Sequence, residues 1–182
     1  MGRNKRRVIV ALYHRDQESL GQNRQRLGNA AYHCAILVIP KARAGPQDWV
    51  FEVTNGVKLS QGSDRRDLNP TRDWWYRSRS DVDKDRSSHL LSMTMIGKLH
   101  SNTSFADIDA LLSRLSVPHK DAVPEENCVS WTRAAIETLI QNNCADQIGV
   151  VDIMDRSVSL ADKVLERLED AQTLVNMTNR PL

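Results

Sequence analysis

The sequence lacks an apolar stretch long enough to cross a membrane, because a spanning helix needs about 20 consecutive apolar residues. Its apolar runs, such as Val8–Tyr13, have the length of a single strand. That run follows basic residues near the N-terminus, yet it is shorter than a signal-peptide core and lacks a small-residue cleavage site. We therefore expect no integral membrane segment and no secretion signal.

Cysteine is scarce: the chain has Cys34, Cys128 and Cys144, and none of them belongs to a CxxC pair. An odd number without metal-ligand spacing argues against a disulfide framework and against a structural zinc site. A zinc site built from His33, Cys34 and Cys128 is an alternative, but the spacing of these residues gives it little support. We expect no metal, no cofactor and a reducing, cytoplasmic location.

An excess of one charge is also missing, since 25 basic residues face 23 acidic ones and the net charge is +2. That balance gives no general attraction to nucleic acid, and we expect no nucleic-acid partner. Basic residues gather near the start and predict a flexible basic arm at 1–7, with salt-sensitive nucleic-acid binding through it as a weaker alternative. Residues 8–182 are expected to form a single domain, whose oligomeric state these patterns do not indicate.

Strand patterns fill the first half of the chain. Residues 31–40 alternate with both faces mostly apolar, which predicts a central strand that is covered on both sides. Residues 49–55 alternate after a loop with Gly45-Pro46 at its tip, so the two strands should pair antiparallel. Further strands are expected at 7–14, 73–79 and 89–97.

Helical patterns dominate the second half. A short helix is expected over Ser104–Leu115, with its serine as the cap, and the best helical pattern runs over Asn127–Ile140. A last helix is expected from about Ser159 to about Met177, with Ser159-x-x-Asp162 as a capping box. Strands first and helices later predict an α+β domain, in which an antiparallel sheet packs against helices.

The start of the helix over 127–140 is the stretch that points to chemistry. Cys128 lies there, where unpaired amide N–H groups favour a thiolate over a thiol. A thiol nucleophile also needs a base and a group that orients the base. His33 in the central strand and Glu52 in the neighbouring strand can bond to each other, because adjacent strands lie about 4.8 Å apart. The candidate catalytic set is therefore Cys128, His33 and Glu52.

Each of these residues also has a purely structural interpretation. A cysteine on the apolar face of a helix is usually a small core residue. A histidine in a strand is often a structural residue with satisfied hydrogen bonds, and Glu52 can be a solvated residue on an outer face. Both interpretations stay open on composition alone.

Three short motifs resemble a known superfamily. They are Tyr32-His-Cys-Ala-Ile-Leu-Val-Ile39, Val50-Phe-Glu-Val-Thr54 and Asn127-Cys-Val-Ser-Trp131. Together they resemble the permuted papain-like branch of the NlpC/P60 superfamily, which includes the lecithin:retinol acyltransferase-like proteins. The resemblance covers residues 31–55 and 125–141, and the remaining length is similar to that of small fungal proteins of unassigned role.

The resemblance implies a permuted papain-like fold with Cys128 as nucleophile and His33 as general base. Glu52 stands where many members have a second histidine or another polar residue, so Asn55 is the alternative third member. The implied activity is that of a hydrolase or acyltransferase that forms a thioester on an amide, ester or thioester substrate. The partner would be a small-molecule, peptide or lipid acyl substrate.

Substrate contacts are expected from residues beside this set, namely Asn127, Trp131 and Trp75. Asn127 can cap the helix or add a polar contact, and Trp75 belongs to an aromatic cluster that can line a groove or fill a core. A different class of function remains open, in which the fold is a catalytically inactive binding or scaffold module that retains Cys128 and His33 as remnants.

Overall fold

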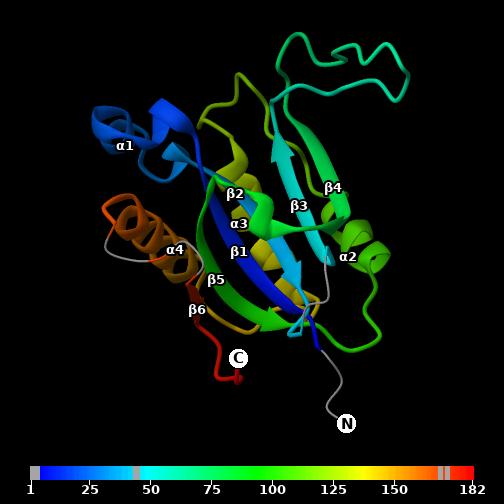
Figure 1. The fold of residues 1–182 in the computed structure, drawn as a ribbon, viewed down its shortest axis with the longest axis vertical. Coiled ribbons are helices and arrows are strands. Elements are labelled where there is room, and N and C mark those ends of the chain that lie inside the picture. The colour runs from blue at the N-terminus through cyan, green and yellow to red at the C-terminus, as the bar shows by residue number, and fades with distance from the viewer. Residues whose placement is uncertain (1–4, 43–45, 168–169, 171–172) are drawn as a thin grey trace.

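The computed structural model describes residues 5–42, 46–167, 170 and 173–182. Its centre is a six-stranded sheet in the order β4-β3-β2-β1-β5-β6 (Figure 1). Every neighbouring pair is antiparallel except β5 and β6, which are parallel. The strands are β1 (Arg7–His14), β2 (Tyr32–Ile39), β3 (Asp48–Thr54), β4 (Trp75–Val82), β5 (Leu90–Lys98) and β6 (Leu174–Asn176).

The predicted central hairpin is present, with β2 and β3 paired antiparallel. Both faces of β2 are buried, as its two apolar faces predict, and β1 covers its other edge along its whole length. Residues 43–45, and with them the predicted glycine at the tip of the connecting loop, lie outside the described residues.

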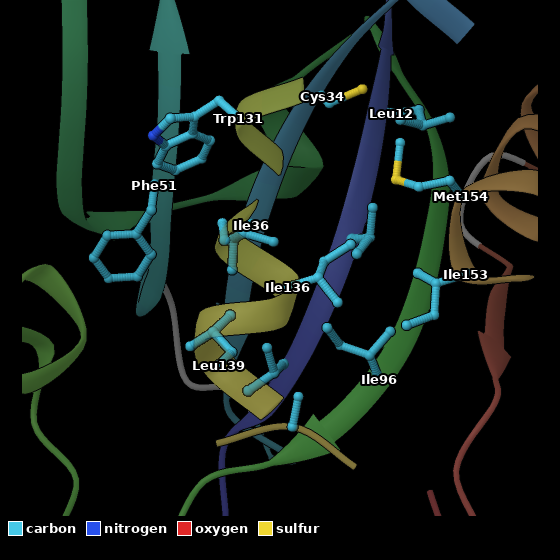
Figure 2. Close-up of a cluster of buried hydrophobic side chains, with 14 of the residues drawn as sticks. Leu12, Cys34, Ile36, Phe51, Ile96, Trp131, Ile136, Leu139, Ile153 and Met154 are labelled. Atoms are coloured by element: carbon cyan, nitrogen blue, oxygen red, sulfur yellow. The ribbon is translucent and has the colours of Figure 1, made fainter. Parts of the chain in front are cut away.

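Four α-helices occur in the described part of the chain: α1 (Gly21–Leu27), α2 (Phe105–Leu112), α3 (Cys128–Gln141) and α4 (Val150–Leu165). Apolar residues of α2, α3 and α4 join those of the sheet in one buried cluster. Figure 2 shows Ile136 of α3 between Ile36 of β2 and Ile96 of β5. The mixed sheet and helices confirm an α+β fold.

A second buried cluster lies on the opposite face of the sheet. Alternation along β2 divides its side chains, so that Cys34 and Ile36 belong to the helix-side cluster while Ala35 and Leu37 belong to the other. The strand therefore has two apolar faces because each face has its own core. His33 shares the parity of Ala35 and Leu37, on the face away from α3.

The predicted last helix is wrong in its bounds. The helix α4 begins at Val150, after the N-cap Gly149, so Ser159 lies inside it and is not a cap. It ends at Leu165, and the chain forms β6 at Leu174–Asn176, where a helix was expected. Residues 168–169 and 171–172 of the predicted helix lie outside the described residues. Residues 174–176 extend the sheet by pairing with the edge of β5, and so they are not helical.

Part of the predicted basic arm packs against the sheet. Residues 1–4 lie outside the described residues, but Arg7 already belongs to β1. The guanidinium of Arg6 lies 4.0 Å from the ring centroid of Trp49 and donates to the carbonyl oxygen of Gln47. None of the helices in the described residues is both long and apolar enough to span a bilayer.

Candidate active site

The pairing between β2 and β3 is short, and its end positions the candidate site. It covers Ile36–Val38 of β2 and Trp49–Phe51 of β3. His33 and Glu52 lie beyond the last pair, on the side where the two strands no longer exchange backbone hydrogen bonds. The His33 ring is thus at an unpaired edge of β2, from which it reaches both Glu52 and the start of α3.

Glu52 holds the imidazole of His33. Its Oε2 atom lies 2.6 Å from Nε2 of His33. Its Oε1 atom accepts from Nε of Arg77 at 2.9 Å and from Nη2 of Arg79 at 3.0 Å. Burial alone would raise the pKa of this carboxyl group, but the hydrogen bond to His33 and the three nearby positive charges lower it to about 2. Glu52 is therefore ionised at neutral pH although its side chain is only 4% exposed.

Cys128 is the first residue of α3, and Asn127 is the N-cap. The Asn127 side chain accepts from the backbone N–H groups of Val129 and Ser130, and the Ser130 hydroxyl accepts from the Asn127 N–H. This capping box fixes the helix start. The Cys128 Sγ atom lies 3.7 Å from the backbone oxygen of Tyr32, next to His33 in sequence.

The thiol of Cys128 and the ring of His33 interact. Burial lowers the pKa of His33, but hydrogen bonds to Cys128 and Glu52 outweigh it and raise that pKa to about 9. The pKa of Cys128 is shifted well below that of an ordinary thiol by hydrogen bonds from Cys34 and His33, against the effect of burial. The arrangement favours a thiolate beside an imidazolium.

Cys34 is a member of this site that the sequence did not reveal. Alternation along β2 puts Cys34 on the face away from His33, and it is fully buried. That face is the one against which α3 begins, so the Cys34 and Cys128 sulfur atoms lie 4.0 Å and 3.7 Å from the same Tyr32 oxygen. A hydrogen bond to Cys128, together with burial, raises the pKa of Cys34. Cys34 is thus the neutral thiol donor of the pair.

The Cys128 residue is only 1% exposed. A surface hollow of about 580 Å³ lies beside the start of α3, and its walls include Asn29 and Ala30 on one side and Asn127 and Val129 on the other. His33 instead lines a cavity of about 470 Å³ at the sheet face away from α3. Cys128 belongs to the lining of neither hollow.

The predicted substrate contacts fall in different places. Trp131 is 2% exposed, and its indole packs 5.8 Å from the Tyr76 ring, so it belongs to the core. Trp75 is half-buried at the start of β4, and its indole N–H donates to the Gly56 oxygen at 3.3 Å. Asn127 contacts the hollow beside α3. The structure therefore brings together Cys128, His33, Glu52 and Asn127, and it does not bring the two tryptophans to the thiol.

One group of metal-ligand type occurs in the described residues, formed by His14, Asp16 and His89. Their ligand atoms lie within 4.8 Å of one another. However, Asp16 has an 82% exposed side chain, and Nδ1 of His14 already accepts from the Asp16 backbone N–H at 3.1 Å. We therefore assign no metal to this group.

Comparison with known proteins gives one match. No curated protein and no solved structure that was compared matches the chain. A family model described as "Family of unknown function (DUF6914)" matches residues 5–167, which include β2, β3, β4 and α3 of the candidate site. The chain belongs to this family.

Proposed function

We propose that the protein is a cysteine-dependent hydrolase or acyltransferase with a permuted papain-like arrangement of its site. The observation that carries the proposal is the chain of contacts from Cys128 through His33 to Glu52. The last contact is 2.6 Å long and involves a buried, ionised carboxylate. A nucleophile, a base and a group that orients the base are the parts that covalent acyl transfer requires.

The reaction would run in two steps. The Cys128 thiolate attacks the carbonyl carbon of an amide, ester or thioester, and the carbonyl electrons move to its oxygen. When the tetrahedral species collapses, the His33 imidazolium gives its proton to the leaving amine, alcohol or thiol, and an acyl thioester remains on Cys128. Neutral His33 then takes a proton from water or an acceptor, which attacks the thioester and frees the thiolate.

The start of α3 offers a donor for the developing oxyanion. The N–H groups of Val129 and Ser130 are bonded to the Asn127 side chain, and that of Trp131 is bonded to the Asn127 carbonyl. Within the described residues, the Cys128 N–H is the first-turn donor without an acceptor. Backbone donors of this kind stabilise tetrahedral oxyanions, and removal of one such donor costs about 10²–10³ in rate.

Burial of Cys128 requires a local opening before substrate reaches it. The hollow beside α3 is the entrance we propose, and the opening would separate Asn29 and Ala30 from Glu125 and Asn127 in its lining. The same burial favours a second candidate function, in which the fold is a catalytically inactive binding module and the three-residue contact is structural. The two candidates differ in whether the thiol becomes accessible in solution.

The first test is the pH profile of iodoacetamide labelling at Cys128, read by peptide mass spectrometry. Burial raises the pKa of Cys144, so this residue is an internal reference on the same chain. The enzyme proposal expects Cys128 to label well below the ordinary thiol pKa of about 8.5, and faster than Cys144. His33→Gln should move the Cys128 profile to higher pH and leave the Cys144 profile unchanged.

Labelling of Cys128 that is as slow as at Cys144, and indifferent to His33→Gln, would overturn the enzyme proposal and favour the binding module. If the labelling result is positive, intact-mass spectrometry with activated esters and thioesters should show an acyl adduct. The adduct should be present on the wild type and missing from Cys128→Ser, since a hydroxyl without a strong base is a much weaker nucleophile than a thiolate.

A further inference from the structure

The cavity of about 470 Å³ at the sheet face away from α3 is a second feature of the site. Its lining includes His33, Glu52 and the β4 side chains Arg77 and Arg79, which lie together in one wall because both arginines bond to Glu52. A volume of this size is within the range of pockets that bind small molecules. It is adjacent to the proposed chemistry, because the same histidine ring lines the cavity and contacts Cys128.

Positive charge exceeds negative charge around the carboxylate in this wall. Glu52 carries one negative charge and contacts both arginines as well as His33, whose raised pKa keeps it protonated. Other charged lining residues are paired with one another or with neighbours, as Arg86 is with Asp83 and Lys84 is with Asp85. With the Cys128 thiolate counted beside His33, two anions stand against three cations, and one positive charge remains in excess on the arginine side of the cavity.

Both arginines also have donors to spare. Arg77 uses Nε and Nη2 on Glu52, and Arg79 uses Nη2. Among the described residues, no acceptor bonds to Nη1 of Arg77 or to Nε and Nη1 of Arg79. Their side chains are 35% and 46% exposed. The guanidinium fork matches the oxygens of a carboxylate or a phosphate, and so two such groups side by side make a suitable anion site.

The rest of the lining includes apolar side chains. Leu37 and Val50 come from the central strands, and Val82 comes from the end of β4. These three residues also belong to or pack against the buried cluster on this face of the sheet. A ligand that fits both parts therefore has an anionic end and an apolar body.

We propose that this cavity binds a small organic anion, in which an apolar chain ends in a carboxylate or a phosphate. The charged group accepts N–H bonds from Arg77 and Arg79, and the apolar chain lies along Val82, beside which the buried Leu37 and Val50 complete the lining. The assignment of this anion as the substrate class rests on the proposed function. Its binding does not, because no step of binding needs the thiol.

The test is isothermal titration calorimetry on the full chain with three probes of equal chain length: octanoate, octyl phosphate and neutral octanol. At least one anion should bind about tenfold or more tightly than octanol, which is the effect of one charge-assisted hydrogen bond. The two anions identify which charged group the arginines prefer. Binding should weaken as salt concentration rises, because the interaction is partly exposed.

Arg79→Gln should weaken anion binding about tenfold, because Arg79 loses its charge while Arg77 and His33 still hold Glu52. Arg114→Gln is the charge-matched control: it removes one exposed positive charge just after α2, outside the cavity lining, and should leave the affinity unchanged. Octanol binding equal to that of both anions would overturn the proposal on the wild type alone. Equal affinities of the Arg79→Gln and Arg114→Gln variants would also overturn it.

The same titration on Cys128→Ser separates this inference from the proposed function. Anion binding that persists in Cys128→Ser supports the site whether or not Cys128 is reactive. If Cys128 labels as an activated thiol but neither anion binds better than octanol, the anion site is wrong and the catalytic proposal stands. If the anions bind but Cys128 is inert, the catalytic proposal is wrong and the anion site stands. The cavity is then that of a binding module.

Discussion

The Nε2 atom of His33 lies 2.6 Å from the Oε2 atom of Glu52, across the point where β2 and β3 cease to pair. Arg77 and Arg79 hold the other oxygen of the same carboxylate. The imidazole is thereby fixed at one nitrogen, and the same ring interacts with the Cys128 thiol. This relationship makes the charge states of three residues depend on one another, and the following predictions test that dependence.

Glu52→Gln should lower the pKa of His33 from about 9 toward the ordinary value of 6.5. The amide keeps the shape of the carboxylate but loses its charge, so the imidazolium loses its electrostatic partner and the two arginines repel it. The measurement is an NMR titration of the histidine ring protons, with the His33 signal assigned by its loss in His33→Gln. A His33 midpoint that stays near 9 in Glu52→Gln would show that Glu52 does not set this charge.

Glu52 should also contribute to stability in a defined pH range. Its folded pKa of about 2 lies below the ordinary value of 4.5, so its contribution is fully present above pH 4.5 and is lost as the pH falls toward 2. The shift corresponds to about 3 kcal/mol. Urea unfolding between pH 2.5 and 7 should show a steeper acid loss for the wild type than for Glu52→Gln. Parallel curves would contradict the prediction.

The alkaline range tests the thiolate–imidazolium pair. The His33 contribution is fully present below pH 6.5 and is lost as the pH rises through about 9. The lowered pKa of Cys128 changes stability in the opposite direction. Its contribution grows as the pH rises toward 9, because the unfolded thiol holds its proton up to about that pH. The two effects offset each other in the wild type, whose stability should change little between pH 6.5 and 9. Cys128→Ala leaves Glu52 as the partner that raises the His33 pKa, so this variant should lose stability as the pH rises above 6.5, as urea unfolding at several pH values will show.

Asn127→Ala should cost about 1 kcal/mol of stability, because the first turn of α3 loses its cap. It should also move the labelling profile of Cys128 to higher pH, since the helix start that favours the thiolate becomes less ordered. Ser104→Ala removes the equivalent cap of α2 and is the matched control. It should cost a similar free energy of unfolding without any change in Cys128 labelling. Equal labelling profiles for the two variants would mean that the α3 cap has no part in activating the thiol.

Local patterns in the sequence were sufficient to predict most elements. An apolar run predicted β1 with its observed bounds, and the two apolar faces of residues 31–40 placed β2 inside the sheet. Two of the three predicted caps, Ser104 and Asn127, are where their side-chain chemistry indicates. These features depend on residues a few positions apart. The contact between His33 and Glu52 was also predictable, because it follows from a short hairpin between two recognisable strands.

Contacts between distant segments were not predictable in the same way. The parallel pairing of β6 with β5 joins Leu174 to Met93, and no local pattern indicates it. The contact between Cys34 and Cys128 depends on which face of β2 receives the start of α3. Burial of Trp131 follows from the same packing. The papain-like arrangement itself rests on three short motifs and remains a proposal.

Cys34 provides the most specific test of the site, because its neutral thiol is the largest influence that lowers the pKa of Cys128. Cys34→Ala removes the donor and should move the Cys128 labelling profile to higher pH, with a loss of about 1 kcal/mol of stability from the small cavity. Cys34→Ser keeps a donor of similar size, because its hydroxyl can donate to the thiolate, and should retain the wild-type profile. A packing role alone would give both variants the same profile. The profile of Cys34→Ser should therefore lie closer to that of the wild type than to that of Cys34→Ala.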